Sequence, residues 1–215
     1  MASAINWDNL PSSKKNSSDG NGKRELNFIK FTNDSVHTIR PVGKAVWFYR
    51  FYYKPIRKYF IANVDPDTGE SNLEELKEIL GCDPEQRFAM NVIDRSDKKI
   101  KILQGPMTML EQFAEVAQAT GRKPGSKEGG DWRITSKGAG KSRRYNCNYL
   151  GSVPFTEEEL EKIKNKDESK NEWYILEKVF KPSDMEYVQK MVNPESETNE
   201  TNDSVDSDID DDIDF

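Results

Sequence analysis

The 215-residue sequence predicts a mainly β protein with a few helices, built around one small curled sheet or barrel. Short runs of β-branched and aromatic residues alternate with clusters of Gly, Pro, Asn, Asp and Ser, which is the pattern of strands joined by turns. Amphipathic stretches of helical spacing interrupt these runs. The length leaves room for one domain of about 150 residues with extensions.

The composition varies along the chain and divides it into three parts. Only 34% of the residues are hydrophobic, 33% are charged, and the mean hydropathy is −0.87. Residues 11–24 are a Ser, Asn, Gly and Lys stretch with nothing to bury, and residues 195–215 carry ten acidic residues and no basic one. We therefore expect a flexible N-terminal arm over 1–24, one folded domain over 25–194 and a disordered acidic tail over 195–215.

The first half of the domain has the pattern of several strands followed by a short helix. The turn signal of residues 32–35 makes the strands on either side of it a hairpin. Pro55 ends or bulges the third strand, and Gly81 stops a helix whose apolar residues recur at helical spacing. In chain order we expect strands over 26–31, 36–41, 44–53 and 57–62, and a helix over 73–80.

The second half of the domain has the pattern of two hairpins separated by a helix. Residues 95–98 are the turn of the first hairpin, and Gly121 lies just beyond the amphipathic helix that follows it. Thr156 and Glu159 have the spacing of a capping box, and Ser183 is the expected N-cap of a last helix. In chain order we expect strands over 88–94 and 99–103, a helix over 107–120, strands over 132–135 and 143–149, and helices from 156 and over 183–192.

The net charge of −6 is the sum of a basic body and an acidic tail. Without residues 195–215 the chain holds 32 Lys and Arg against 28 Asp and Glu, and residues 23–150 hold 23 against 16. Such asymmetry predicts a polyanionic partner for the body. Among small curled sheets, the partly open OB barrel is the one most used to hold single-stranded nucleic acid, so we expect a five-stranded OB-like barrel with added helices.

Residues 46–60 interleave aromatic and basic side chains. Strand alternation divides them between two faces, and a core needs only one. On the open face, rings would stack bases and cations would neutralise phosphates; alternatively the rings fill a barrel and are covered by a helix, and which face is open stays undecided. One face holds Trp47, Tyr49, Phe51 and Tyr53, and the other holds Phe48, Arg50 and Tyr52. The expected nucleic-acid contacts in this run are Trp47, Tyr49, Arg50, Tyr52, Tyr53, Lys54, Arg57, Lys58 and Tyr59.

Residues 137–145 form a basic loop that contains two glycines. Glycine lets the backbone approach a phosphate closely, and four basic side chains in eight residues give a local positive field whose binding depends on salt. A solvated hairpin tip is the alternative. The contacts that we expect here are Lys137, Lys141, Arg143, Arg144 and Tyr145, and those expected elsewhere are Arg40, Lys44 and Arg95.

The end of the chain mixes acidic with apolar residues. Ile209, Ile213 and Phe215 are spaced through the acids, and Phe215 adds its own carboxylate. A partner protein with a small basic-rimmed pocket can capture such a ring and carboxylate, and the same acids can occupy the body's own basic groove. The residues expected to act in this way are Asp210, Asp211, Asp212, Ile213, Asp214 and Phe215.

Several function classes find no support in the sequence. Cys82 and Cys147 lie far apart without a CxxC motif, and His37 is the one histidine, so a zinc site or a nucleophilic triad lacks its members. The sequence has no phosphate-binding glycine motif and no apolar run of about 20 residues. We expect no cofactor, no metal, no catalysis and no membrane contact from a soluble, intracellular protein; a nuclease that uses metal-bound carboxylates is the weakest alternative.

A resemblance to a known family rests on residues 87–95, 99–103, 107–120 and 131–145. Together these segments look like the core of the helix-destabilising single-stranded-DNA-binding proteins of tailed bacteriophages. Phe31 and residues 36–41 look like the first barrel hairpin of the same family. Residues 203–215 resemble the acidic, Phe-terminated end that phage and bacterial single-stranded-DNA-binding proteins share. The resemblance implies an OB fold that binds single-stranded DNA without sequence preference during phage DNA replication, recombination and repair.

The same resemblance implies partners and a location. The tail would recruit replication proteins such as a DNA polymerase, helicase or primase, the protein would self-associate on DNA, and it would act in the cytoplasm of an infected bacterial host. The chain departs from the best-known branch of the family because Cys82, Cys147 and His37 cannot form a zinc subdomain. Two alternatives stay open, a protein-interaction adaptor that uses the acidic tail and an RNA-binding OB protein.

Overall fold

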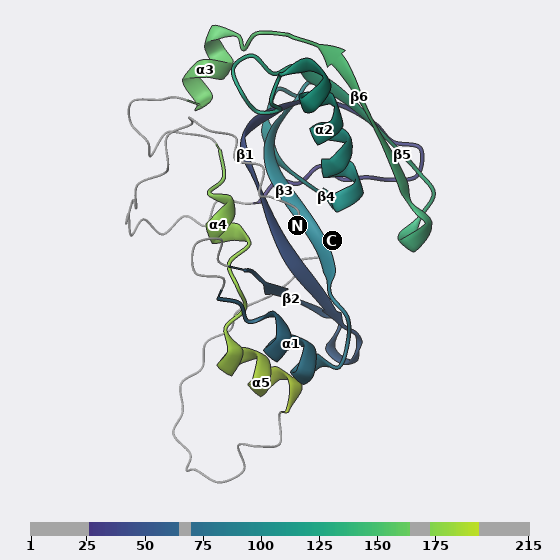
Figure 1. The fold of residues 1–215 in the computed structure, drawn as a ribbon, viewed down its shortest axis with the longest axis vertical. Helices are drawn as coiled ribbons and strands as arrows, with labels where there is room; N and C mark the ends of the chain where they lie inside the picture. The colour runs from purple at the N-terminus through teal and green to yellow at the C-terminus, as the bar shows by residue number, and fades with distance from the viewer. Residues whose placement is uncertain (1–25, 65–69, 164–172, 194–215) are drawn as a thin grey trace.

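The computed structural model describes residues 26–64, 70–163 and 173–193 (Figure 1). This part of the chain is mainly β, as the sequence predicts. The expected N-terminal arm and acidic tail lie outside the described residues, and the tail residues concerned are Asp210, Asp211, Asp212, Ile213, Asp214 and Phe215.

The described residues form six strands, five helices and two short 3-10 turns. The strands are β1 (Val36–Tyr53), β2 (Lys58–Ala62), β3 (Glu85–Asp94), β4 (Ile100–Pro106), β5 (Asp131–Lys137) and β6 (Arg144–Gly151). The helices are α1 (Leu73–Leu80), α2 (Met107–Thr120), α3 (Glu157–Ile163), α4 (Leu176–Val179) and α5 (Met185–Val192), and the turns are η1 (Lys54–Ile56) and η2 (Gly140–Ser142). The predicted bounds of α1 and α2 are confirmed.

All six strands belong to one antiparallel sheet. Five of them lie in the order β4-β3-β1-β5-β6, and β2 pairs with the second half of β1. β5 returns through α2 to lie beside β1, so β1, β3, β4 and β5 have the 4-1-2-3 order of a Greek key. The pairings among the described residues leave the sheet open between its edge strands β4 and β6, so the OB-like barrel that we expect from the sequence is not confirmed.

The edge of β6 that faces the opening is partly covered by α2. The side-chain amide of Gln112 donates a hydrogen bond to the Tyr145 carbonyl oxygen (3.2 Å) and accepts one from the Cys147 backbone N–H (2.8 Å). Unpaired backbone groups at a sheet edge require partners of this kind. Gln112 therefore replaces a neighbouring strand at two positions of this edge.

β1 serves several neighbours because it bends at a bulge between Val42 and Val46. Gly43 in the bulge has a φ of 75°, and its N–H donates to the Gly125 carbonyl oxygen at 3.1 Å. A Cβ on Gly125 would lie 2.1 Å from the Gly43 oxygen, so the loop before β5 can approach the bulge only with glycine at this position. Beyond the bulge, β1 pairs with β2 and extends away from the Greek key.

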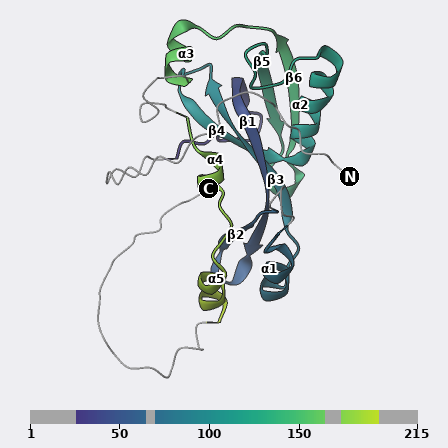
Figure 2. The ribbon, with the colours of Figure 1, turned by 60° about the vertical axis from the view of Figure 1, so that its left-hand side comes forward.

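The sheet separates two cores, and Figure 2 shows α2 on one side of it and α3 and α4 on the other. We call the two sides the α2 face and the C-terminal face. Buried residues of the α2 face include Ile39, Phe88, Met90, Leu103, Phe113, Trp132 and Ile134. Buried residues of the C-terminal face include Val42, Phe48, Ala89, Ile93, Ile102, Ile163, Tyr174, Leu176 and Phe180.

A third core lies between the second half of β1, β2, α1 and α5. We call it the arm core; it is unrelated to the N-terminal arm of residues 1–24. The buried residues of the arm core are Phe51, Phe60, Ala62, Leu76, Leu80 and Val188. α1 and α5 lie side by side at the end of the molecule away from β6 (Figures 1 and 2). The aromatic run of the sequence therefore crosses from one core into another.

The predicted hairpin between residues 26–31 and 36–41 is wrong. Residues 27–29 run parallel to β4 instead, where the Ile102 N–H donates to the Asn27 carbonyl oxygen (2.7 Å) and the Ile29 N–H donates to the Ile102 carbonyl oxygen (2.9 Å). Both edges of β1 are occupied by β3 and β5, so the segment pairs with the free edge of β4.

The last helix begins two residues later than predicted, and its N-cap is Asp184 rather than Ser183. The Asp184 carboxylate accepts a hydrogen bond from the Tyr187 N–H at 3.0 Å. Ser183 pairs with β2 instead, because its hydroxyl accepts from the Ile61 N–H (2.9 Å) and its N–H donates to the Ile61 carbonyl oxygen (2.8 Å).

The predicted capping box of α3 is confirmed. The Thr156 N–H donates to Glu159 Oε2 (2.9 Å), and the Glu159 N–H donates to Thr156 Oγ1 (3.2 Å). The short helix α4 has no counterpart among the sequence predictions.

Candidate nucleic-acid interface

The aromatic and basic run in β1 follows the predicted alternation, and its first face is mostly packed. Phe51 is buried in the arm core, while Tyr49 and Tyr53 are half-buried against it. Trp47 is half-buried against the α2-face core and meets Tyr49 edge to face at 5.9 Å. On the second face, Phe48 is buried. The half-buried Trp47, Tyr49 and Tyr53 have their rings engaged in cores, so the open end of the second face offers the freer aromatic surface.

That open end carries a group of side chains that we call the tyrosine patch, namely Arg50, Tyr52, Tyr59 and Arg87. Tyr52 and Tyr59 are paired across β1 and β2, their ring centroids are 4.8 Å apart, and they are 42% and 43% exposed. The Arg50 guanidinium carbon lies 4.4 Å from the centroid of the Tyr59 ring. Two exposed rings beside arginines are a surface on which flat bases can stack.

Arg87 belongs to this patch but is missing from the sequence predictions. It lies opposite Phe48 on β3, and its Nε atom is buried without a hydrogen-bond partner among the described residues. Burial, and then the nearby charge of Arg50, lower the pKa of Arg87. The Glu85 carboxylate contacts both arginines, at 3.1 Å from Arg50 and 3.8 Å from Arg87. The sequence signal for Arg87 was its position two residues after Glu85, just before the strand predicted over 88–94. In the structure β3 begins at Glu85, so the two side chains lie on the same side of the strand.

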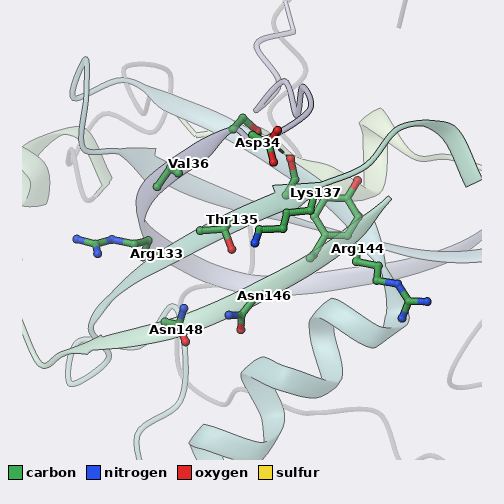
Figure 3. Close-up of a pocket in the computed structure, with 11 residues that line it drawn as sticks. Asp34, Val36, Arg133, Thr135, Lys137, Arg144, Asn146 and Asn148 are labelled. Atoms are coloured by element: carbon green, nitrogen blue, oxygen red, sulfur yellow. Dashed lines mark hydrogen bonds between the residues drawn. The ribbon is translucent and has the colours of Figure 1, made fainter. Parts of the chain in front are cut away.

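The second group of predicted contacts lies on the β5–β6 hairpin. Outward-facing partners across these strands are Lys137 with Arg144, Thr135 with Asn146, and Arg133 with Asn148. They line an open cleft of about 510 Å³ that we call the hairpin cleft (Figure 3). Its remaining lining residues are Asp34, Ser35, Val36, Ser136 and Tyr145.

The hairpin cleft is rich in unneutralised positive charge. Arg133, Lys137 and Arg144 take part in none of the ion pairs between described residues. Figure 3 shows their side chains projecting from the two strands together with the amides of Asn146 and Asn148. Among the described residues, Asp34 is the one acidic residue that lines the cleft, and it forms no ion pair with these three cations. An excess of cations next to uncharged donors and acceptors suits a chain of phosphates and sugars.

The one acidic residue of the hairpin strands is held elsewhere. Asp131 accepts two hydrogen bonds from Arg95, from Nε at 3.0 Å and from Nη2 at 2.8 Å. Arg95 also contacts Glu159 of α3. Burial opposes the charge on Arg95, but the hydrogen bonds and the charge of Asp131, together with Glu159, outweigh it and raise the pKa of Arg95. Arg95 therefore ties β3 to β5 and α3, and we no longer place it in the interface.

Arg40 is also withdrawn from the predicted interface, because its side chain is buried. Its Nη2 donates to the carbonyl oxygens of Ser126 and Lys127, both at 3.3 Å, and its guanidinium lies 4.2 Å from the centroid of the Phe155 ring. Burial lowers the pKa of Arg40, and the nearby charge of Asp131 offsets this only in part. Arg40 holds the loop before β5 and the segment before α3 on the sheet.

The other predicted contacts lie outside the tyrosine patch and the hairpin cleft. Lys54 and Arg57 are exposed at the turn between β1 and β2, Lys44 is exposed at the bulge, and the Lys58 ammonium donates to the Tyr187 hydroxyl at 3.2 Å. At the hairpin tip, Arg143 is half-buried and its Nε donates to the Gly138 carbonyl oxygen at 3.4 Å. The side chain of Lys141 lies outside the described part.

The structure thus brings Lys137, Arg144 and Tyr145 together in the hairpin cleft and Arg50, Tyr52 and Tyr59 in the tyrosine patch. Sequence reasoning missed Arg133, Asn146 and Asn148. Their signal was the alternation of the hairpin strands, which places every second residue beside the predicted cations.

Within the described residues, no group of three or more His, Cys, Asp or Glu side chains is placed to share a metal ion. Burial raises the pKa of the Cys147 thiol to about 12. Among the described helices, none has the length and the apolar character that crossing a membrane requires.

A scan against protein-family models and a search of curated proteins each find no match for this chain.

Proposed function

We propose that this chain binds single-stranded DNA, largely without regard to sequence, and does so without catalysing a reaction. The observation that carries the proposal is the hairpin cleft, where Arg133, Lys137 and Arg144 have no acidic partner among the described residues. Such a surface attracts a polyanion, and binding releases the counterions of each phosphate that it neutralises.

The strand order supports an OB-type architecture for the sheet. The first, second and third strands of the Greek key are β1, β3 and β4; α2 then leads to β5, and a hairpin adds β6. A five-stranded, partly open Greek-key barrel that binds oligonucleotides on its strands and loops is the OB fold. On this proposal, β2 and α1 are an insertion between the first two barrel strands, and the β5–β6 loop is the connection between the last two.

The tyrosine patch favours single strands over duplexes. Tyr52 and Tyr59 offer ring faces to solvent, and a ring can stack on a base only when that base has left its own stack. Cations alone would bind duplex DNA as well, since its backbone carries the same charge. The combination of exposed tyrosines and an unneutralised cleft therefore suits unpaired nucleotides best.

The biological setting that we propose follows the resemblance of residues 87–145 to phage helix-destabilising proteins. Coating single strands during phage DNA replication, recombination and repair would be the task of the folded domain. Recruitment of a DNA polymerase, helicase or primase would be the task of the tail that ends at Phe215, as its acidic and aromatic composition suggests.

The test is a fluorescence-anisotropy titration of the full chain with a labelled oligo-dT of about 20 nucleotides and with a duplex of equal length, at several salt concentrations. We expect binding to oligo-dT that weakens with salt and clearly weaker binding to the duplex. The variant Lys137→Ala/Arg144→Ala removes two phosphate contacts, so the slope of log K against log salt should become shallower by roughly 1.4. At 0.1 M salt this corresponds to a loss of roughly 10- to 30-fold.

The matched control is Lys178→Ala/Lys181→Ala, which removes two exposed lysines of the C-terminal segment and changes the net charge equally. Its slope of log K against log salt should equal that of the natural chain within experimental error. Absence of oligo-dT binding by the natural chain would refute the proposal. Equal losses in the two double variants would show that net charge, rather than the hairpin cleft, governs binding.

A further inference from the structure

The tyrosine patch contains an internal ion pair whose geometry resembles a bound phosphate. Glu85 lies directly opposite Arg50 in the register of β3 and β1, and Arg87 follows two residues later on the same side of β3. One carboxylate oxygen, Oε2 of Glu85, contacts both guanidinium groups, at 3.1 Å and 3.8 Å. A single anionic oxygen shared by two arginines is how proteins commonly hold a phosphate oxygen.

The two arginines differ from ordinary surface cations. Their side chains are only about one-fifth exposed, whereas the Glu85 side chain is 58% exposed. The anionic partner is therefore the solvated member of the group, and the cations are the more buried members. Among the described residues, Glu85 is the one carboxylate that forms an ion pair with either arginine.

Aromatic surface lies directly beside this ion pair. Tyr59 stacks under the Arg50 guanidinium, and Tyr52 is next to Tyr59 across the strand pair. On the other side, the stacked rings of Phe48 and Phe180, 4.5 Å apart, close the C-terminal face. The exposed part of this face therefore begins where the covering C-terminal segment ends, and it contains both cations and rings.

We propose that the two arginines of the tyrosine patch hold one backbone phosphate of single-stranded DNA, and that the Glu85 carboxylate occupies this phosphate position in the free protein. The neighbouring base stacks on the exposed rings of Tyr52 and Tyr59. This inference rests on the proposed function, to which it adds a defined subsite and an internal competitor.

Exchange of a carboxylate for a phosphate is energetically accessible here. An exposed ion pair contributes little to stability, because solvent screens it and the side chains lose freedom in forming it. A phosphate with its neighbouring sugar and base adds the stacking contact that Glu85 lacks. Glu85 thus neutralises part of the charge of the two arginines in the free protein without blocking the incoming strand.

The decisive variant is Glu85→Gln, which removes the competing charge and keeps the shape of the side chain. We expect oligo-dT binding to tighten about two- to fivefold, the factor by which an exposed ion pair shifts an equilibrium. The slope of log K against log salt should steepen by roughly 0.7, because a phosphate then neutralises an unpaired cation instead of replacing a carboxylate. The control is Glu78→Gln on α1, which changes the net charge equally. Glu78 is exposed and takes part in none of the ion pairs described above.

The rings are tested separately. Tyr52→Ala/Tyr59→Ala should weaken oligo-dT binding at least about fivefold, whereas Tyr52→Phe/Tyr59→Phe, which keeps the ring faces, should bind within about twofold of the natural chain. Both tyrosines are exposed, so the fold should tolerate either change. Circular dichroism of each variant is the check that it is folded.

The outcomes separate this inference from the proposed function. If the natural chain does not bind oligo-dT, the proposed function itself fails. If the natural chain binds and Glu85→Gln changes neither affinity nor salt slope beyond Glu78→Gln, the phosphate subsite is refuted. If the alanine pair binds as well as the phenylalanine pair, bases do not stack on these rings.

Discussion

Replacement of Arg95 by methionine should destabilise the fold while leaving the hairpin cleft chemically intact. Arg95 donates two hydrogen bonds to Asp131 and contacts Glu159, so one side chain connects β3, β5 and α3. Methionine retains most of the apolar stem and removes the charge. The two carboxylates, whose side chains are 13% and 9% exposed, would then lose the cation that contacts both of them, and the buried Arg40 would be the nearby charge that remains.

The magnitude follows from the partial burial of this network. Removing one partner of a fully buried ion pair costs about 3–5 kcal/mol, because the other charge is left buried and uncompensated. Arg95 is one-fifth exposed, so solvent screens part of the loss, and we expect about 2–4 kcal/mol. A domain of this size has about 5–15 kcal/mol of total stability, so the variant should still fold.

Urea unfolding measures the effect. Trp132 is buried in the α2-face core and adjoins Asp131, so tryptophan fluorescence reports on the region affected. With a slope of about 2 kcal/mol per molar urea, the midpoint should fall by about 1–2 M. The comparison variant is Arg133→Met, whose exposed side chain lies outside the ion pairs of the described residues; it should change stability by less than about 0.5 kcal/mol and weaken oligo-dT binding.

Arg95 lies in the turn just after β3 and Arg133 lies on β5, and the two side chains have different roles. A loss below about 0.5 kcal/mol for Arg95→Met would refute the structural role of this network. Weaker DNA binding by Arg95→Met, with normal stability, would return Arg95 to the interface.

Two further predictions concern stability. Burial alone would raise the pKa of Asp94, but hydrogen bonds from Lys101 (2.8 Å) and Ser96 (2.7 Å to its hydroxyl) outweigh it, so the pKa is lowered. Because the pKa of Asp94 is lower in the folded than in the unfolded protein, its charged form stabilises the fold above pH about 4, and this contribution is lost as pH falls through the folded-state pKa. Asp94→Asn should therefore make the free energy of unfolding less dependent on pH, as measured by urea unfolding between pH 2 and 7. Gly125→Ala should lower the thermal midpoint measurably, since its Cβ would lie 2.1 Å from the Gly43 oxygen, and an unchanged midpoint would contradict this contact.

Local signals in the sequence were sufficient to predict several elements. The apolar spacing and the following glycines define α1 and α2, and the capping box defines the start of α3. The turns at residues 95–98 and around Gly138 likewise predict the β3–β4 and β5–β6 hairpins. In each case the decisive interactions lie within a few residues of one another, so neighbouring sequence contains them.

Non-local pairing could not be predicted in the same way. The segment at Asn27–Ile29 has a strand pattern and a turn after it, but its partner depends on which strand edges remain free. Ser183 and Asp184 are both good N-caps, and the choice between them depends on β2, whose backbone at Ile61 engages Ser183. Both outcomes depend on residues far away in the sequence, Ile102 for Asn27–Ile29 and Ile61, 122 positions away, for Ser183.

The candidate site also combines features that the local sequence predicts with features that depend on tertiary packing. Arg40 and Arg133 lie in strand-like segments of the sequence and Arg95 lies in a turn signal, and nothing nearby in the sequence shows which of the three is covered in the fold. Their environments differ because Phe155 covers Arg40 and Glu159 reaches Arg95, whereas Arg133 lies in an open cleft. Charge pattern predicted a basic body, and tertiary packing decided which cations remain on its surface.

The covered middle of the C-terminal face explains why the proposed interface lies at the ends of the sheet. In an OB fold the second and third strands commonly contact the ligand, and on the OB-type arrangement that we propose those strands would be β3 and β4. The Asn91 side chain donates to the Tyr174 carbonyl oxygen and accepts from the Tyr174 N–H, both at 2.9 Å, which fixes the C-terminal segment across β3. Two buried hydrogen bonds and the buried ring of Phe180 make this segment part of the core. Removing it would expose an apolar sheet, so the interface that we propose uses polar surface outside this segment, at the hairpin cleft and the tyrosine patch.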